Sequence, residues 1–153
     1  MDTDIDEINK TEKMIVFFKF SMRLLSLAYF IGALFFFFIP DGVNYILNFL
    51  PIFLKVLQPL PDKNVDYFWL PLVGSLMFVL TYIAFQSSRD PHNKILLNVH
   101  ILSKLISALG YFYLFVVHAY IFGYIVGGVL DFAICCFVLY LKIKIQNIPK
   151  NES

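Results

Sequence analysis

Long runs of apolar residues, separated by short polar segments, are the main pattern along this chain. A transmembrane helix needs about 20 consecutive and mostly apolar residues. Four stretches meet this requirement, namely residues 14–39, 67–87, 91–117 and 121–141. The pattern therefore predicts an all-α, polytopic membrane protein whose four transmembrane helices form a four-helix bundle. The polar segments 1–13 and 142–153 are expected to be tails outside the membrane.

The first connection has a helical pattern of its own, over residues 41–58. Its polar residues fall within about 100° on a helical wheel, and apolar residues occupy the remainder. These polar residues are Asp41, Asn44, Asn48, Lys55 and Gln58. Such a pattern is typical of an amphipathic helix that lies in the membrane interface. A re-entrant segment packed against the bundle is the alternative, and the sequence leaves both open.

Composition agrees with a membrane environment, because 59% of the 153 residues are hydrophobic and only 15% are charged. Soluble domains contain about 25% charged residues. We therefore expect a single membrane domain over residues 1–153, with the lipid bilayer as its surroundings. The net charge of +1 gives no argument for nucleic acid as a partner.

The distribution of cations predicts the orientation of the chain. In a four-span topology one side carries Lys10, Lys13, Arg89, Lys94, Lys142, Lys144 and Lys150. The other side carries only Lys55 and Lys63. The positive-inside rule then predicts that both termini and the 89–94 turn are cytoplasmic. In that turn, Asp90 is expected to cap the third span and Pro91 to occupy its first helical position.

Three full charges, Arg23, Lys104 and Asp131, lie within three different predicted spans. At a rise of about 1.5 Å per residue, each would lie roughly 13 to 15 Å from the cytoplasmic end of its helix. Charges at this depth are rare, usually face the bundle interior, and cost at least about 2.5 to 3.5 kcal/mol each. We therefore expect these three side chains to meet in a buried polar centre.

Further polar residues share one face of the third span with Lys104, namely His100, Ser103, Ser107 and Tyr111. Asp131 is expected to accept hydrogen bonds from Lys104 or Arg23. The serines of this face, Tyr111 and Ser26 of the first span would satisfy the remaining donors and acceptors. This arrangement would leave one excess cation. Together, Arg23, Asp131 and this face form the candidate binding site.

The polar centre has three possible uses. It can be a structural ion pair that fixes helix register, or a site that binds or carries an anionic lipid or small anion and handles protons. It can also be the centre of a lipid-modifying enzyme, for which only His100 and Asp131 are available as acid and base. We expect a non-enzymatic accessory or assembly protein, with a larger membrane complex or a homo-oligomer as partner. No metal or cofactor is expected, because the three histidines do not cluster at ligand spacing.

Small residues in the fourth span suggest close helix packing. Gly123 and Gly127 form a small-xxx-small pair, which serves either packing within the bundle or dimerisation. Cys135 and Cys136 are neighbours that would point about 100° apart on a helix. We interpret them as small packing residues rather than as a disulfide or a metal site.

Several short motifs resemble a pattern found in small four-helix bacterial membrane proteins of unassigned function. They are Phe68-Trp69, Gly74-Ser75-Leu76-Met77, Arg89-Asp90-Pro91, Ser103-Lys104 with Ser107, and Gly127 with Asp131. The resemblance covers roughly residues 20–141. The order of a first span, an amphipathic connection and three further spans is also similar to the DoxX-like group. This resemblance implies the fold and a location in the bacterial inner membrane, and it transfers no activity or functional residue.

Overall fold

The computed structural model describes residues 2–55, 57–59, 69–117 and 120–148 of the chain. This part is built from the helices α1 (Asp2–Phe38), α2 (Pro40–Leu54), α3 (Trp69–Arg89), α4 (Lys94–Val117) and α5 (Phe122–Gln146). The helices α1, α3, α4 and α5 are long and apolar enough to cross a membrane. The predicted all-α polytopic fold is therefore confirmed.

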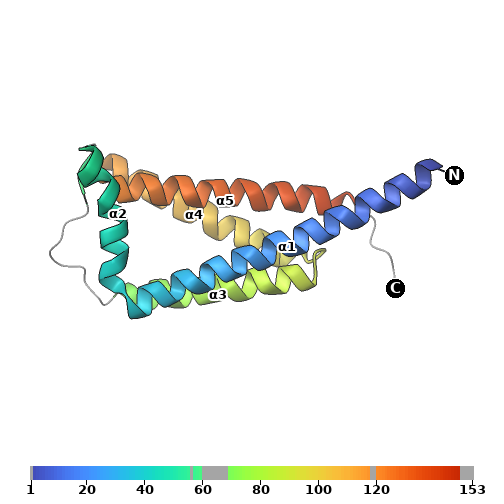
Figure 1. Cartoon of the computed structure of the whole chain (residues 1–153), viewed down its shortest axis with the longest axis horizontal. Helices are drawn as coiled ribbons and strands as arrows, with labels where there is room; N and C mark the ends of the chain where they lie inside the picture. The colour runs from blue at the N-terminus through green and yellow to red at the C-terminus, as the bar shows by residue number, and fades with distance from the viewer. Residues whose placement is uncertain (1, 56, 60–68, 118–119, 149–153) are drawn as a thin grey trace.

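The four spanning helices form two pairs, in which α1 packs along α3 and α4 packs along α5. Figure 1 shows that the pairs lie close together near the turn between α3 and α4, and that they diverge toward the opposite end. A hydrophobic core joins the pairs at the closed end. Its fully buried side chains include Phe18, Met22, Leu97, Leu141 and Ile145.

Helix α1 is longer than the sequence pattern predicted. It begins at Asp2, so the expected polar tail 1–13 is almost entirely helical. This segment has no Gly or Pro, and its sequence is rich in acidic residues near the start, a composition that favours the N-terminal end of a helix. Among the α1 side chains that the structure describes, Met14 is the first that packs against the hydrophobic core, and the preceding turns project beyond the bundle (Figure 1).

Helices α4 and α5 also differ from their predicted bounds. The side chain of Asn93 accepts a hydrogen bond of 3.2 Å from the backbone N–H of Leu96, so Asn93 takes the capping role expected of Asp90. Asp90 instead closes the turn, because its carbonyl accepts a hydrogen bond from Asn93. Helix α5 continues past residue 141 to Gln146, so this part of the expected tail is helical. Lys144 in its last turn complements the helix dipole.

The amphipathic helix α2 lies across the open end of the bundle and contacts both α1 and α5 (Figure 1). Asn48 and Pro51 lie on its buried side, whereas Tyr45, Phe49 and Phe53 are exposed. A helix in the membrane interface is expected to turn its polar side to water. Asn48, which belongs to the predicted polar side, instead turns toward the protein.

The chain leaves α2 earlier than expected and then pairs with the start of α5. Lys55 adopts a left-handed conformation, with φ of 53°, and ends the helix before residue 58. The backbone N–H of Gln58 donates a hydrogen bond of 3.1 Å to the carbonyl of Tyr120. The N–H of Phe122 donates one of 3.0 Å to the carbonyl of Gln58. These two bonds attach the segment that follows α2 to the start of α5.

Two glycines of α5 make room for aromatic rings of α4. A Cβ atom on Gly127 would lie 3.0 Å from the ring of Tyr111, and one on Gly128 would lie 2.8 Å from the ring of Phe112. Contacts this short would force the rings to move. Gly127 and Gly128 therefore serve packing within the bundle.

We predict that Gly128→Ala destabilises the protein, because the added methyl group overpacks the contact with Phe112 and overpacking costs about 1 to 3 kcal/mol. Gly110→Ala is the matched control, since nothing lies within 4 Å of a Cβ at that position. The control should gain up to about 1 kcal/mol from helix propensity. Thermal unfolding in detergent, followed by circular dichroism, measures both. Equal shifts for the two variants would contradict the proposed packing.

Candidate functional site

Lys104 of α4 and Asp131 of α5 form an ion pair in the middle of the bundle. The distance from Nζ to Oδ1 is 2.7 Å, and the side chains are only 6% and 14% exposed. Lys104 lies ten residues from the start of α4, which places it about 15 Å along the helix. The structure thus brings two of the three predicted charges together.

The energetics of this pair depend on both partners. A buried charge-assisted hydrogen bond of this length is strong, but much of the gain offsets the cost of removing two charges from water. Loss of one partner would leave an uncompensated charge in an apolar environment, which costs about 3 to 5 kcal/mol. The pair therefore specifies how α4 and α5 face each other.

Tyr29 connects this pair to α1. Its ring centroid lies 4.9 Å from Nζ of Lys104, within the range of a cation–π interaction. Its hydroxyl and Nε2 of His100 share a hydrogen bond of 2.8 Å, and both side chains are buried. We call Tyr29, His100, Lys104 and Asp131 the polar centre. It joins α1, α4 and α5.

The hydrogen bonding of His100 favours one assignment of its protons. Nδ1 is buried and has no hydrogen-bond partner. If Tyr29 donates to Nε2, the single unpaired donor is the N–H at Nδ1. If Nε2 donates instead, both the hydroxyl hydrogen of Tyr29 and the lone pair of Nδ1 lack partners. The first arrangement leaves fewer groups unsatisfied, so we assign Tyr29 as the donor.

Sequence reasoning missed Tyr29. A signal for it was present, because Phe18, Met22, Tyr29 and Ala33 recur at the spacing of one helix face. All four side chains are buried. A buried tyrosine hydroxyl needs a hydrogen-bond partner, and that requirement points toward a polar neighbour.

Arg23 does not join the polar centre, and its side chain is exposed. The hydroxyl of Ser26 donates a hydrogen bond of 2.9 Å to the carbonyl of Thr81, which fixes the register of α1 against α3. Along the helix axes, at about 1.5 Å per residue, Arg23 lies about 4.5 Å from this bond and Arg89 about 12 Å from it, both toward the same end. Arg23 therefore lies only about 7.5 Å farther into the bundle than Arg89. The expected depth of 13 to 15 Å was counted from residue 14, whereas the level of Arg89 corresponds to residue 18 of α1, eight residues before Ser26.

The remaining predicted site residues of α4 do not bond to the ion pair. Ser103, Ser107 and Tyr111 are partly buried, and within the described residues none of them hydrogen-bonds to Lys104 or Asp131. Tyr111 instead packs over Gly127. The predicted role of Ser26 in the polar centre is also wrong, because its hydroxyl bonds to the carbonyl of Thr81 on α3.

The chemistry available at this site is limited. In the part of the chain that the structure describes, no group of three or more His, Cys, Asp or Glu residues is placed to hold a metal ion. Both cysteines are free thiols. Sγ of the buried Cys135 lies 3.6 Å from the carbonyl oxygen of Ile101, a weak contact between α5 and α4. The polar centre can therefore pair charges and hold protons, with one thiol nearby as a packing group.

Comparison with known proteins gives no match: no family model, no curated protein and no solved structure is similar to this chain. The resemblance to small four-helix bacterial membrane proteins therefore stays a prediction.

We predict that Tyr29→Phe destabilises the protein by about 1 to 3 kcal/mol, because both ring nitrogens of His100 would then be buried without a partner. The phenyl ring should still lie near Lys104, so the change measures the contribution of the hydroxyl group alone. Tyr113→Phe is the control, since Tyr113 is 61% exposed. Unfolding free energies in mixed detergent micelles provide the measurement. If both variants behave alike, the bond between Tyr29 and His100 contributes nothing to stability.

Proposed function

We propose that this chain is a non-enzymatic integral membrane protein that acts as an accessory or assembly subunit. Its polar centre serves to hold α1, α4 and α5 in register. The observation that carries this proposal is the mutual neutralisation of Lys104 and Asp131 at 2.7 Å. A charge that already has an internal partner is unavailable to a substrate unless that pair is broken.

The hydrogen bonding around the pair supports the structural role. Among the buried side-chain polar atoms of the described residues, Nδ1 of His100 alone lacks a partner. The idea of an anion bound inside the bundle depended on a second cation beside Asp131. Arg23 was expected to be that cation, but it is exposed on α1. The polar centre is therefore better suited to specifying helix packing than to binding an anion.

The projecting start of α1 supports a role in assembly. Residues 2–13 are helical, but Met14 is the first described side chain of α1 that packs against the hydrophobic core. In proteins, most of the stability of a helix comes from tertiary packing, which the end of a projecting helix lacks. A partner that contacts this segment would stabilise it. Its mixture of acidic and basic residues suits a polar protein surface.

We also propose an orientation and a location. Arg89, Lys94 and Lys144 are exposed at the end of the bundle from which the start of α1 projects. The positive-inside rule assigns this end, and with it both termini, to the cytoplasm. Together with the resemblance to bacterial membrane proteins, this supports a bacterial inner membrane as the location.

A double-mutant cycle tests the structural role of the ion pair. Lys104→Met and Asp131→Asn should each lower the unfolding free energy by about 3 to 5 kcal/mol, because each leaves one buried charge unpaired. The combined variant should recover much of this loss. Lys142→Met, which removes an exposed hydrogen bond of 2.6 Å to Asn98, is the control and should change stability by at most about 0.5 kcal/mol. Strictly additive losses would refute the pairing.

Purification of the tagged full chain from its native membrane in mild detergent tests the accessory role. We expect a larger membrane protein to copurify in a fixed stoichiometry. Deletion of residues 2–11 should release this partner without changing the thermal unfolding of the bundle, because core packing begins at Met14. The chain purifying alone, or retaining its partner after the deletion, would contradict the role assigned to α1.

A further inference from the structure

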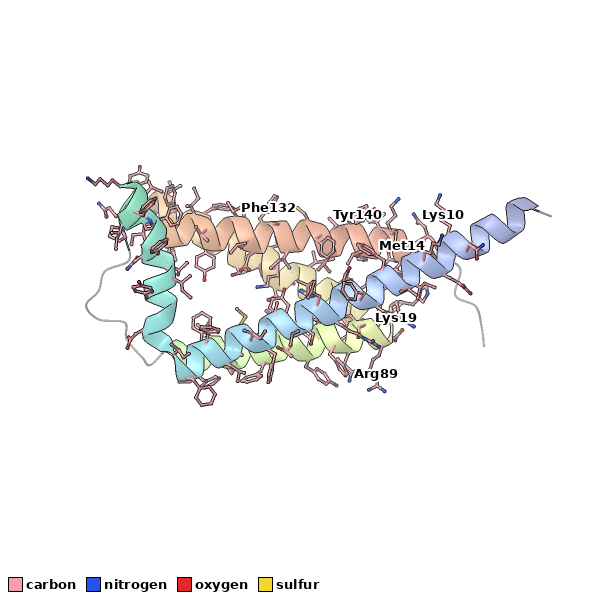
Figure 2. All side chains as sticks on the ribbon, viewed as in Figure 1. Lys10, Met14, Lys19, Arg89, Phe132 and Tyr140 are labelled. Atoms are coloured by element: carbon pink, nitrogen blue, oxygen red, sulfur yellow. The ribbon has the colours of Figure 1, made fainter. Side chains whose placement is uncertain are left out.

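Three cations lie at one end of the pair formed by α1 and α3. Arg23 and Arg89 are exposed, and Lys19 is half-buried. Within the described residues, none of the three forms an ion pair or a side-chain hydrogen bond. Figure 2 shows Lys19 and Arg89 near the same end of this helix pair. These charges therefore differ from Lys104, whose partner lies inside the protein.

The register of the two helices places the cations at similar depths. From the bond between Ser26 and Thr81, Lys19 lies seven residues away, or about 10.5 Å, and Arg89 lies eight residues away, or about 12 Å. Both distances run toward the same end, because α1 and α3 are antiparallel. Arg23 is only three residues, or about 4.5 Å, from the same bond, so it lies nearer to the middle of the bundle than the other two cations. The three cations thus cover roughly the depth of one lipid headgroup region.

The cations also lie on one side of the helix pair. At about 100° per residue, Lys19 and Arg23 share a face of α1 with Phe30. By the same calculation, Arg89 shares a face of α3 with Phe78. The rings of Phe30 and Phe78 contact each other edge to face, with centroids 5.8 Å apart. This contact shows that the two faces adjoin along the same side of the pair.

Apolar side chains continue from the cations toward the membrane interior. Phe30 and Phe78 are both exposed, as is Phe85 on the same face of α3. We call Lys19, Arg23, Arg89, Phe30, Phe78 and Phe85 the cation–aromatic strip. It combines positive charge at headgroup depth with an apolar surface at acyl-chain depth.

We propose that the cation–aromatic strip binds an anionic glycerophospholipid. The lipid phosphate accepts hydrogen bonds from Lys19, Arg23 and Arg89, and one acyl chain packs against the phenylalanines. Arg23 provides the main reason to choose a lipid over a soluble anion. Its Cα lies nearer to the middle of the bundle than that of Arg89, on a surface that faces the membrane. Lipid phosphate is the anion available at such a surface. This site is separate from the polar centre and goes beyond the structural role proposed for it.

Native mass spectrometry of the full chain tests this proposal, with phosphatidylglycerol and phosphatidylcholine of identical acyl chains as probes. The wild-type protein should retain phosphatidylglycerol at least about tenfold better, since cations near a membrane surface each contribute about fivefold in affinity for anionic lipid. Arg23→Gln and Arg89→Gln should each weaken binding about fivefold. The combined Lys19→Gln, Arg23→Gln and Arg89→Gln variant should lose the preference.

Two control variants make the result specific. Lys94→Gln removes an exposed cation at the same end of the bundle but on α4, and it should leave lipid retention unchanged. Arg23→Lys keeps the charge and should retain most of the binding. All these positions carry exposed or half-buried charges, and unchanged helicity by circular dichroism would verify folding.

Three outcomes would overturn the proposal. Equal retention of phosphatidylcholine would show that apolar contact alone holds the lipid. An equal loss in Lys94→Gln would show diffuse attraction to the basic end of the protein. Displacement of the lipid by millimolar inorganic phosphate would indicate a site for a soluble anion instead.

Discussion

A full charge cannot remain unpaired in the hydrocarbon of a membrane without a large cost, and the pairing of Lys104 with Asp131 meets this constraint inside the bundle. Because the two residues lie on α4 and α5, their bond selects one rotation and one register for that helix pair. Gly127 and Gly128 then allow the aromatic rings of α4 to approach the backbone of α5. Charge pairing and close packing thus specify the same interface.

The polar centre also explains how the two helix pairs are held together. Hydrophobic contacts join them near the turn between α3 and α4, whereas α2 lies across the end at which they diverge (Figure 1). Tyr29 provides a polar contact between the pairs, through the imidazole of His100 and the ammonium group of Lys104. The two cations differ in their surroundings: Lys104 is paired within the protein, while Arg23 is exposed on the outer face of α1.

Much of the fold was accessible from the sequence, because spanning helices follow from runs of apolar residues. The starts and ends of these helices were less accessible. Residues 2–13 are polar yet helical, since neither Gly nor Pro interrupts them and α1 continues into them without a break. Helix α2 was expected from its amphipathic pattern, but the wheel alone did not show that Asn48 would turn toward the bundle.

The sequence by itself determined that the chain spans a membrane several times and that intramembrane charges must find partners. Apolar length and the cost of burying charge are local properties, so both conclusions can be read from residue types and spacing. Only the tertiary structure decided which charges meet. The register of α1 against α3 places Arg23 on the outer surface and Tyr29 beside Lys104. Which charges meet depends on how the faces of several helices pack together, and the sequence of any one helix does not determine that packing.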